Sequence, residues 1–297
     1  MSTSDHNPMG SHAVSAFANF ANKYEKGTGG TTRYIARKLI LMSPPFTDDS
    51  KVLDNATGTG VVVEEIQRTL SGGRIQVPVI AADAAQPMID NLNAKVDHAA
   101  ETNTWPNVSV KTHAVPAEKL DGSVVSSNSI THAYMNFGLF FCSDPVLAAS
   151  HIFRCLVPGG QASITTWHNL GYMVPIRQTH RELYPEAPEI KMPFPDSWED
   201  PVWVKELLVK AGFNRDNVRV TQEDSLMRFA NLQEMANTKT ELFTALIKGQ
   251  EGWKNEEAKR EFAERLAEKL LLYELYADEG ENGVTLRMVA NVAICTK

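Results

Sequence analysis

Cysteine is scarce in this sequence, and its spacing excludes several architectures. The three cysteines, Cys142, Cys155 and Cys295, form no CxxC pair and leave an odd number. This excludes a disulfide framework and a cysteine-based zinc site, and it favours a reducing compartment. No run of 18 or more apolar residues occurs, which argues against a transmembrane helix. The first ten residues are polar and lack the apolar core of a signal peptide, so we expect an intracellular, cytoplasmic protein.

Clusters of basic residues are also absent. The net charge is −7, and binding to a phosphate backbone needs grouped positive charge, so nucleic acid is not expected as the main partner. The sequence shows neither a metal-ligating cluster nor an acid/base dyad, and no metal is expected. With 43% hydrophobic and 22% charged residues, the composition is that of an ordinary globular protein. The length of 297 residues suits one large α/β domain or two smaller ones.

The most informative stretch is VLDNATGTG, which covers Val52 to Gly60. A short apolar run ends in Asp54, and Gly58 and Gly60 then precede a helix-like segment from Val61. This pattern predicts a strand, a tight turn and a helix N-terminus. Glycine at both positions allows turn dihedrals that other residues avoid, and it lets a ligand approach the backbone closely.

The position of the acid bears on which ligand the turn would hold. A dinucleotide fold would have a third glycine three residues after the second, where this chain has Val63. Asp54 precedes the glycines, where it would repel a pyrophosphate but could accept a hydrogen bond from an ammonium group. The stretch therefore favours an adenosyl ligand with an amino-acid tail over NAD.

The glycine turn resembles motif I of the class I S-adenosylmethionine-dependent methyltransferases. That motif usually reads acid-x-G-x-G-x-G, and Ala56 stands at its first glycine. A second apolar run, Val77 to Asp83, ends in an acid, where a nucleoside-binding sheet holds the ribose hydroxyls. The segment that follows is similar to the family's strand-2 motif, which implies that Ala84 lies at the cofactor and that Met88 packs on the adenine.

Three further motifs follow in the family's order. Ala117-Glu118-Lys119-Leu120 resembles the adenine loop D-A-E-x-L, with Pro116 in place of the Asp, so the backbone of Ala117 or the side chain of Glu118 would replace that contact. Asn136-Phe137-Gly138, after the expected fourth strand, stands at motif IV, where the bound methyl faces the acceptor. The run L-x-P-G-G, ending at Gly160, is typical of the family before strand five.

The resemblance also implies a cover over the site. Helices within residues 11–45 would cover the cofactor, and insertions 168–200 and 225–280 would form a substrate lid. Arg33 would pair with the methionine carboxylate, and His168 is a weak candidate for a general base. The implied cofactor contacts are Tyr24, Arg33, Asp54, Ala56, Gly58, Gly60, Asp83, Ala84, Met88, Ala117, Glu118, Asn136 and Phe137. The implied substrate pocket is lined by Phe137, Trp167, Tyr172 and Trp198.

We therefore expect a single domain, residues 1–297, with the α/β fold of this family. Its core, 50–223 and 284–297, would be a seven-stranded, mostly parallel, Rossmann-like sandwich with helical lid additions, the last strand entering antiparallel between strands five and six. S-adenosyl-L-methionine would be the methyl donor and S-adenosyl-L-homocysteine the product. The acceptor would be an N, S or O atom of a small aromatic or heterocyclic molecule, as in fungal secondary-metabolite methyltransferases.

Two other classes stay open from the sequence alone. One is a non-catalytic, methyltransferase-like binding subunit, because no residue proves turnover. The other is an NAD-dependent oxidoreductase, which Val63 and the placement of Asp54 disfavour. The oligomeric state cannot be read from these patterns.

Overall fold

The computed structural model describes residues 24–190, 194–246 and 255–297. The helix expected to begin near Ser11 lies outside these residues. The first described helix is the short α2, Tyr24–Gly27. None of the helices in the described ranges combines the length and hydropathy needed to cross a membrane.

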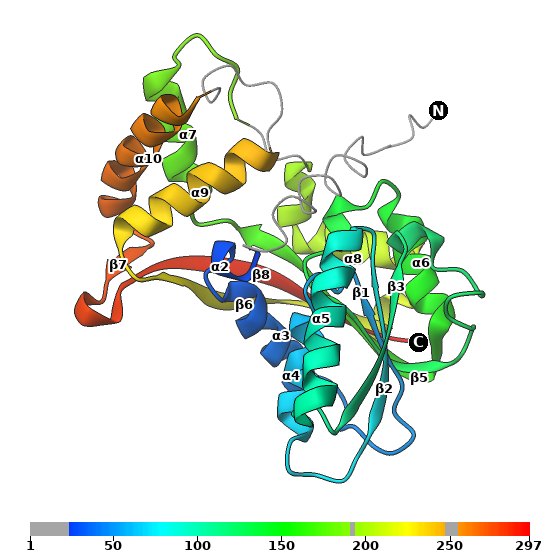
Figure 1. Ribbon diagram of the computed structural model, residues 1–297. Helices are drawn as coiled ribbons and strands as arrows, with labels where there is room; N and C mark the ends of the chain where they lie inside the picture. Colours follow the sequence, from blue (N-terminus) through cyan, green and yellow to red (C-terminus); the bar gives the residue numbers. More distant parts are fainter. Residues whose placement is uncertain (1–23, 191–193, 247–254) are drawn as a thin grey trace, which may run out of the picture.

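A twisted sheet forms the centre of the molecule (Figure 1). In the described residues it has eight strands in the order β3-β2-β1-β4-β5-β8-β6, with β7 paired to β8. Their bounds are β1 Val52–Asn55, β2 Val77–Asp83, β3 Val108–Ala114, β4 Ile130–Met135, β5 Leu156–Asn169, β6 Val218–Phe229, β7 Tyr276–Asp278 and β8 Val284–Thr296.

The strand directions confirm the predicted topology. Strands β1 to β5 pair in parallel, and β8 runs antiparallel between β5 and β6. The count differs from the seven expected strands because β7 adds three residues along β8. The sixth strand runs beyond the expected core boundary at residue 223, since β6 stays paired with β8 as far as Phe229 and Val284.

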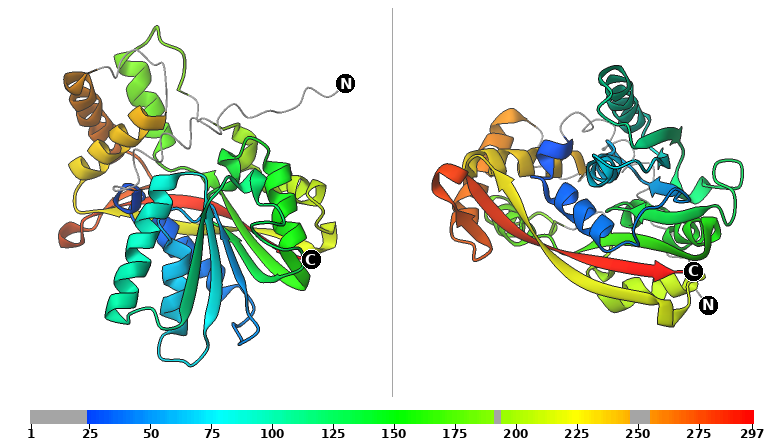
Figure 2. Two further views of the ribbon diagram at one scale, coloured as in Figure 1. Left: turned by 45° about the vertical axis from the view of Figure 1, so that its right-hand side comes forward. Right: turned by 90° about the horizontal axis from the view of Figure 1, so that it is seen from below.

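Helices cover both faces of the sheet (Figure 2). On one face lie α3 Thr31–Leu41, α4 Val61–Leu70 and α5 Gln86–Thr102, and on the other lie α6 Pro145–Cys155 and α8 Pro201–Lys210. Helices α6 and α8 both begin with the sequence Asp-Pro. Asp144 accepts a hydrogen bond from the backbone N–H of Leu147, and Asp200 does so from Val202. A proline follows each acid, where its missing N–H costs nothing.

A second group of helices packs at the far end of β6 and β8 (Figure 1). It consists of α7 Met173–Leu183, α9 Leu232–Leu246 and α10 Glu256–Leu271. An apolar stripe holds α10 in place, because Phe262, Leu266 and Leu270 recur at helical spacing and are fully buried. These helices occupy the segments that we expect to form the lid.

Candidate functional site

The glycine turn has the predicted form. Gly60 caps the N-terminus of α4 with φ 87°, and Gly58 has φ 56°. A Cβ at Gly60 would lie 2.5 Å from Leu92 Cδ1, so α5 packs directly on the turn. Ala56 also has a positive φ of 59°, so the residue at the family's first glycine keeps a glycine-like conformation. That conformation costs an alanine about 1–2 kcal/mol.

Asp83 stands at the end of β2 and reaches the turn. Its Oδ2 accepts a hydrogen bond from the backbone N–H of Gly58 at 2.9 Å, and Oδ1 accepts one from Ala85 at 2.9 Å. Each carboxylate oxygen keeps a second lone pair for another donor. Burial raises the pKa of Asp83, and the two backbone donors oppose that shift. The structure thus brings the acid predicted for the ribose beside the glycine turn.

Polar atoms without partners gather at the end of β1. Asp54 is fully buried, and its Oδ2 accepts a hydrogen bond from the Thr57 hydroxyl at 2.5 Å, while its Oδ1 has no partner in the described part of the chain. Both side-chain polar atoms of the buried Asn55 also lack partners among the described residues. Buried polar groups are normally paired, so each orphan needs an explanation. A polar ligand seated at the turn supplies one, and the unpartnered carboxylate oxygen of Asp54 is an acceptor that suits an ammonium group.

The loop after β4 is tied to two neighbouring elements. The side-chain amide of Asn136 donates to the Thr32 carbonyl at 3.0 Å, and its Oδ1 accepts from the Thr165 hydroxyl at 3.0 Å. The backbone N–H of Phe137 also donates to Thr165 Oγ1, at 2.8 Å. The Asn136 side chain therefore positions the loop. Thr165, inside β5, carried no sequence signal for this role because its partner comes from another strand.

The glycine turn and the loop after β4 are in contact. A Cβ at Gly138 would lie 2.4 Å from the Ala56 Cβ, closer than real Cβ atoms approach. Motifs I and IV therefore share one packed surface, and glycine at 138 is what allows it.

Gly138→Ala should destabilise the chain by about 1–3 kcal/mol, as expected for overpacking. Denaturant unfolding would measure the loss. Gly122→Ala is the matched control, because nothing lies within 4 Å of a Cβ there. Equal stability of the two variants would show that the two loops separate easily.

The predicted adenine loop forms a short turn, η2 Ala117–Lys119. The Glu118 carboxylate accepts hydrogen bonds from the backbone N–H of Ser143 at 2.6 Å and from its hydroxyl at 2.9 Å, beside the start of α6. The Glu118 carboxylate thus binds Ser143 of the protein itself, and it does not replace the missing adenine contact in this structure. Ala117 is 7% exposed and Met88 is 2% exposed, and the backbone of Ala117 stays the predicted adenine contact.

The four aromatic residues predicted for the substrate pocket do not form one group. Phe137 and Trp167 stack with their ring centroids 3.9 Å apart. Trp198 is 2% exposed and packs edge-on against Trp203, with its centroid 4.6 Å away. The Trp198 carbonyl also accepts from Thr166, the neighbour of Trp167 in β5. Neighbouring residues of a strand point to opposite faces, so Trp198 belongs to the core on the other side of the sheet.

Tyr172 is buried against Phe243 of α9, beside a buried lysine. Lys239 of α9 is 1% exposed, its Nζ donates to the Gly27 carbonyl at 2.8 Å, and it lies 4.7 Å from the Tyr172 ring centroid. Burial lowers the pKa of Lys239 to about 7. Tyr172 thus helps to join α9 to α2, a contact that no sequence pattern indicated.

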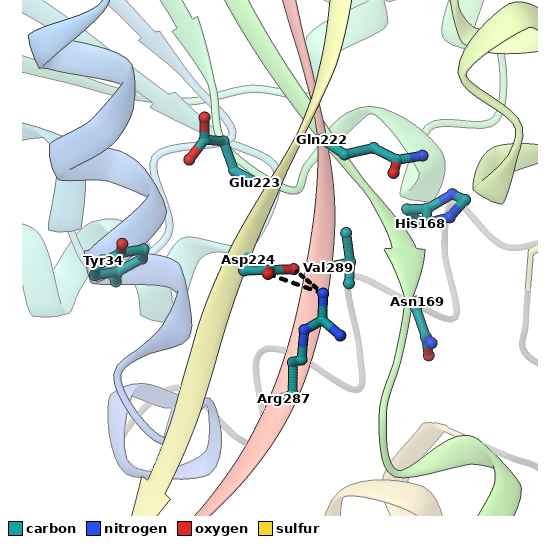
Figure 3. A pocket seen from close by; sticks show the side chains of 8 residues that line it. All are labelled: Tyr34, His168, Asn169, Gln222, Glu223, Asp224, Arg287 and Val289. Atoms are coloured by element: carbon teal, nitrogen blue, oxygen red, sulfur yellow. Dashed lines mark hydrogen bonds and ion pairs between the residues drawn. The ribbon is translucent and has the colours of Figure 1, made fainter. Parts of the chain in front are cut away.

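His168 also lies on the face away from Trp167. Its Nδ1 donates to the Glu199 carbonyl at 2.7 Å. The ring lines an open polar groove with Gln222, Asp224 and Arg287, the last two of which form an ion pair (Figure 3). The structure therefore does not bring this candidate base to the stacked pair Phe137 and Trp167. The register shift between Trp167 and Asn169 is not visible in the sequence.

Two residues near the start of the described chain, Tyr24 and Arg33, were predicted to contact the cofactor. Tyr24 begins α2, but its side chain lies outside the described residues. Arg33 binds carboxylates of the protein in this structure: it donates to Glu25 at 2.8 Å and contacts Glu64. Its predicted pairing with the methionine carboxylate stays a prediction. No group of three or more His, Cys, Asp or Glu side chains in the described ranges is placed to hold a metal ion.

Comparisons with known proteins agree with this geometry. Residues 53–164 match the family model of a methyltransferase domain. The methyltransferase tpcH of Aspergillus fumigatus is 26% identical over 217 residues, which cover 70% of this chain and 73% of that protein.

Solved structures show the same fold at low identity. A methyltransferase candidate from Bacillus halodurans superposes with a TM-score of 0.54 at 16% identity, covering 88% of this chain and 98% of that one. A phosphoethanolamine N-methyltransferase of Haemonchus contortus, solved with phosphomonomethylethanolamine and S-adenosylhomocysteine, gives 0.51 at 16% identity, covering 95% and 60%. The glycine turn, the strand order and the matched domain together support the assignment of this chain as a class I S-adenosylmethionine-dependent methyltransferase.

Proposed function

We propose that this protein transfers a methyl group from S-adenosyl-L-methionine to an N, S or O atom of a small aromatic or heterocyclic acceptor. The observation that carries the proposal is the set of orphaned polar atoms of Asp54 and Asn55 beside the glycine turn. A buried carboxylate with a free oxygen suits the ammonium of an amino-acid tail, which NAD lacks.

Each residue of the site is proposed to contact a different part of the ligand. Asp83 has lone pairs for ribose hydroxyls, Asp54 would hold the ammonium, and the backbone of Ala117 would meet the adenine. Bound S-adenosylmethionine supplies a methyl group on a positively charged sulfur, which makes the leaving group good. Transfer then depends mainly on the alignment of acceptor and methyl. The stacked Phe137 and Trp167, at the carboxyl ends of β4 and β5, offer an apolar wall for a planar acceptor.

The kind of acceptor is inferred from the same surroundings. His168 faces away from Trp167, and we assign no base, which favours amines and thiols over alcohols. A role in secondary metabolism is supported by the likeness to a fungal methyltransferase. A screen of amine, thiol and phenol acceptors, read out as methylated product, would identify the atom that is modified.

Calorimetric titration with S-adenosylmethionine, S-adenosylhomocysteine and NAD tests the cofactor. We expect both adenosyl ligands to bind at micromolar concentration and NAD not to bind. Binding without turnover across the acceptor screen would indicate a non-catalytic subunit. Binding of NAD alone would overturn the proposal.

Asp83→Asn should weaken S-adenosylhomocysteine about 10- to 100-fold, because hydrogen bonds to a charged group contribute roughly 1.5–3 kcal/mol. The dissociation constant from calorimetry checks this. Asp97→Asn, on the exposed side of α5, is the matched control and should bind as the wild type does. An unchanged dissociation constant for Asp83→Asn would show that Asp83 does not bind the ribose.

A further inference from the structure

A carboxylate of the protein is held beside the glycine turn by two cations and a hydroxyl. Glu25 Oε2 accepts from Arg33 Nη2 at 2.8 Å, and Oε1 accepts from Lys95 Nζ at 2.9 Å. The hydroxyl of Thr59, between the two glycines, donates to the same Oε1 at 3.2 Å. Three donors from three separate elements thus converge on one carboxylate.

The donors are held in place without Glu25. Glu64 of α4 binds Lys95 at 2.7 Å and also contacts Arg33. Lys95 further donates to the Thr59 carbonyl at 3.0 Å. Arg33 Nη1 also lies 3.5 Å from Glu65 Oε1. If Glu25 left, these contacts would keep both cations beside the turn. The cluster has the form of a preorganised receptor for a carboxylate.

Glu25, the carboxylate that these donors now bind, lies on a short helix. Glu25 lies on α2, a helix of four residues at the start of the described chain, whereas Arg33, Thr59 and Lys95 belong to α3, the glycine turn and α5. These elements lie side by side in Figure 1. The side chains of Glu25, Arg33 and Lys95 are about a third exposed, at 39%, 32% and 33%, so solvent and a ligand can reach them.

We propose that Arg33, Lys95 and Thr59 form the subsite for the α-carboxylate of the adenosyl ligand, and that Glu25 fills this subsite until the ligand displaces it. The inference rests on the proposed function and names the regulation of that site. Ligand binding would exchange the Glu25 carboxylate for that of the ligand, so Arg33, Lys95 and Thr59 keep a hydrogen-bond acceptor with and without the ligand. The exchange also makes ligand entry depend on a shift of α2.

Two ligands isolate the contribution of the amino-acid tail. S-adenosylhomocysteine carries the amino-acid tail, whereas methylthioadenosine has the same adenosyl thioether without it. Calorimetry with both ligands is carried out on the full chain and on the variants Glu25→Gln and Lys95→Met. Glu101→Gln, exposed on α5, serves as the control for loss of a surface carboxylate.

We expect Glu25→Gln to bind S-adenosylhomocysteine about tenfold more tightly, because its carboxylate no longer competes. Lys95→Met should weaken the same ligand about tenfold or more. Methylthioadenosine should bind all four proteins alike. Circular dichroism and thermal unfolding show that each variant is folded, and Glu25→Ala provides a second removal of the carboxylate.

The opposite pattern would overturn the inference. If Glu25→Gln and Glu25→Ala bind S-adenosylhomocysteine no better than the wild type, Glu25 is only a clamp between helices. Equal weakening of both ligands by Lys95→Met would likewise place Lys95 away from the tail. If the wild type binds neither adenosyl ligand, the proposed function itself fails, which is a distinct result.

Discussion

A valine in place of Gly58 is expected to abolish binding of S-adenosylmethionine and S-adenosylhomocysteine in a chain that still folds. Gly58 has φ 56°, and its backbone N–H donates to Asp83 Oδ2 at 2.9 Å. A β-branched side chain is strained in that conformation, and the strain would shift the turn that the proposed ligand approaches. The substitution therefore damages the turn and the carboxylate of Asp83 together.

The strain alone should not unfold the protein. It amounts to about 1–2 kcal/mol for an ordinary residue, against about 5–15 kcal/mol of stability for a typical protein. Calorimetry measures the binding, and circular dichroism measures the fold. Gly72→Val is the matched control, since Gly72 has φ 82° with nothing within 4 Å of a Cβ. Retained binding in Gly58→Val, or its equal loss in Gly72→Val, would contradict the role of the turn.

Asp54 gives the second large effect, through pH. Burial raises its pKa to about 7, while the Thr57 hydroxyl lowers it and the charge of Asp83 raises it further. In the unfolded chain a carboxyl titrates near pH 3.9. Between these values the folded state holds a proton that the unfolded state has lost. The contribution of Asp54 to stability is therefore full below about pH 4 and is lost as the pH rises through 7.

Asp54→Asn removes this dependence. A shift of roughly three pH units corresponds to about 4 kcal/mol between pH 4 and 7, so the variant should lose much less stability over that range than the wild type. Denaturant unfolding at several pH values measures the difference. Parallel curves for the two proteins would mean that Asp54 titrates normally.

The same titration should govern binding. An ammonium favours the ionised carboxylate, so S-adenosylhomocysteine should bind more tightly to the wild type as the pH rises from 6 to 8, releasing a proton from Asp54. Calorimetry in buffers of different ionisation enthalpy detects that proton. Asp54→Asn should bind weakly, without the pH dependence, and Asp97→Asn should behave as the wild type. A constant affinity across this range in the wild type would remove Asp54 from the amino-acid tail.

The sequence by itself determined the parts of the site that depend on local chain geometry. Asp54, Gly58, Gly60 and Asp83 lie where the strand, turn and helix signals placed them, because positive φ values and strand ends are set by neighbouring residues. The resemblance then supplied the order of the strands, including the antiparallel last one, which no local pattern encodes.

Only the tertiary structure decided which side chains face one another. His168 and Trp198 lie away from Trp167 because β5 alternates its faces and packs against η4, Asp196–Glu199. The carboxylate of Glu118 is turned to α6 by the N–H of Ser143, and Arg33 is joined to Lys95 through Glu25 and Glu64. Such partners are far apart in the chain, so their contacts depend on how the layers pack, which residue type and local period do not encode.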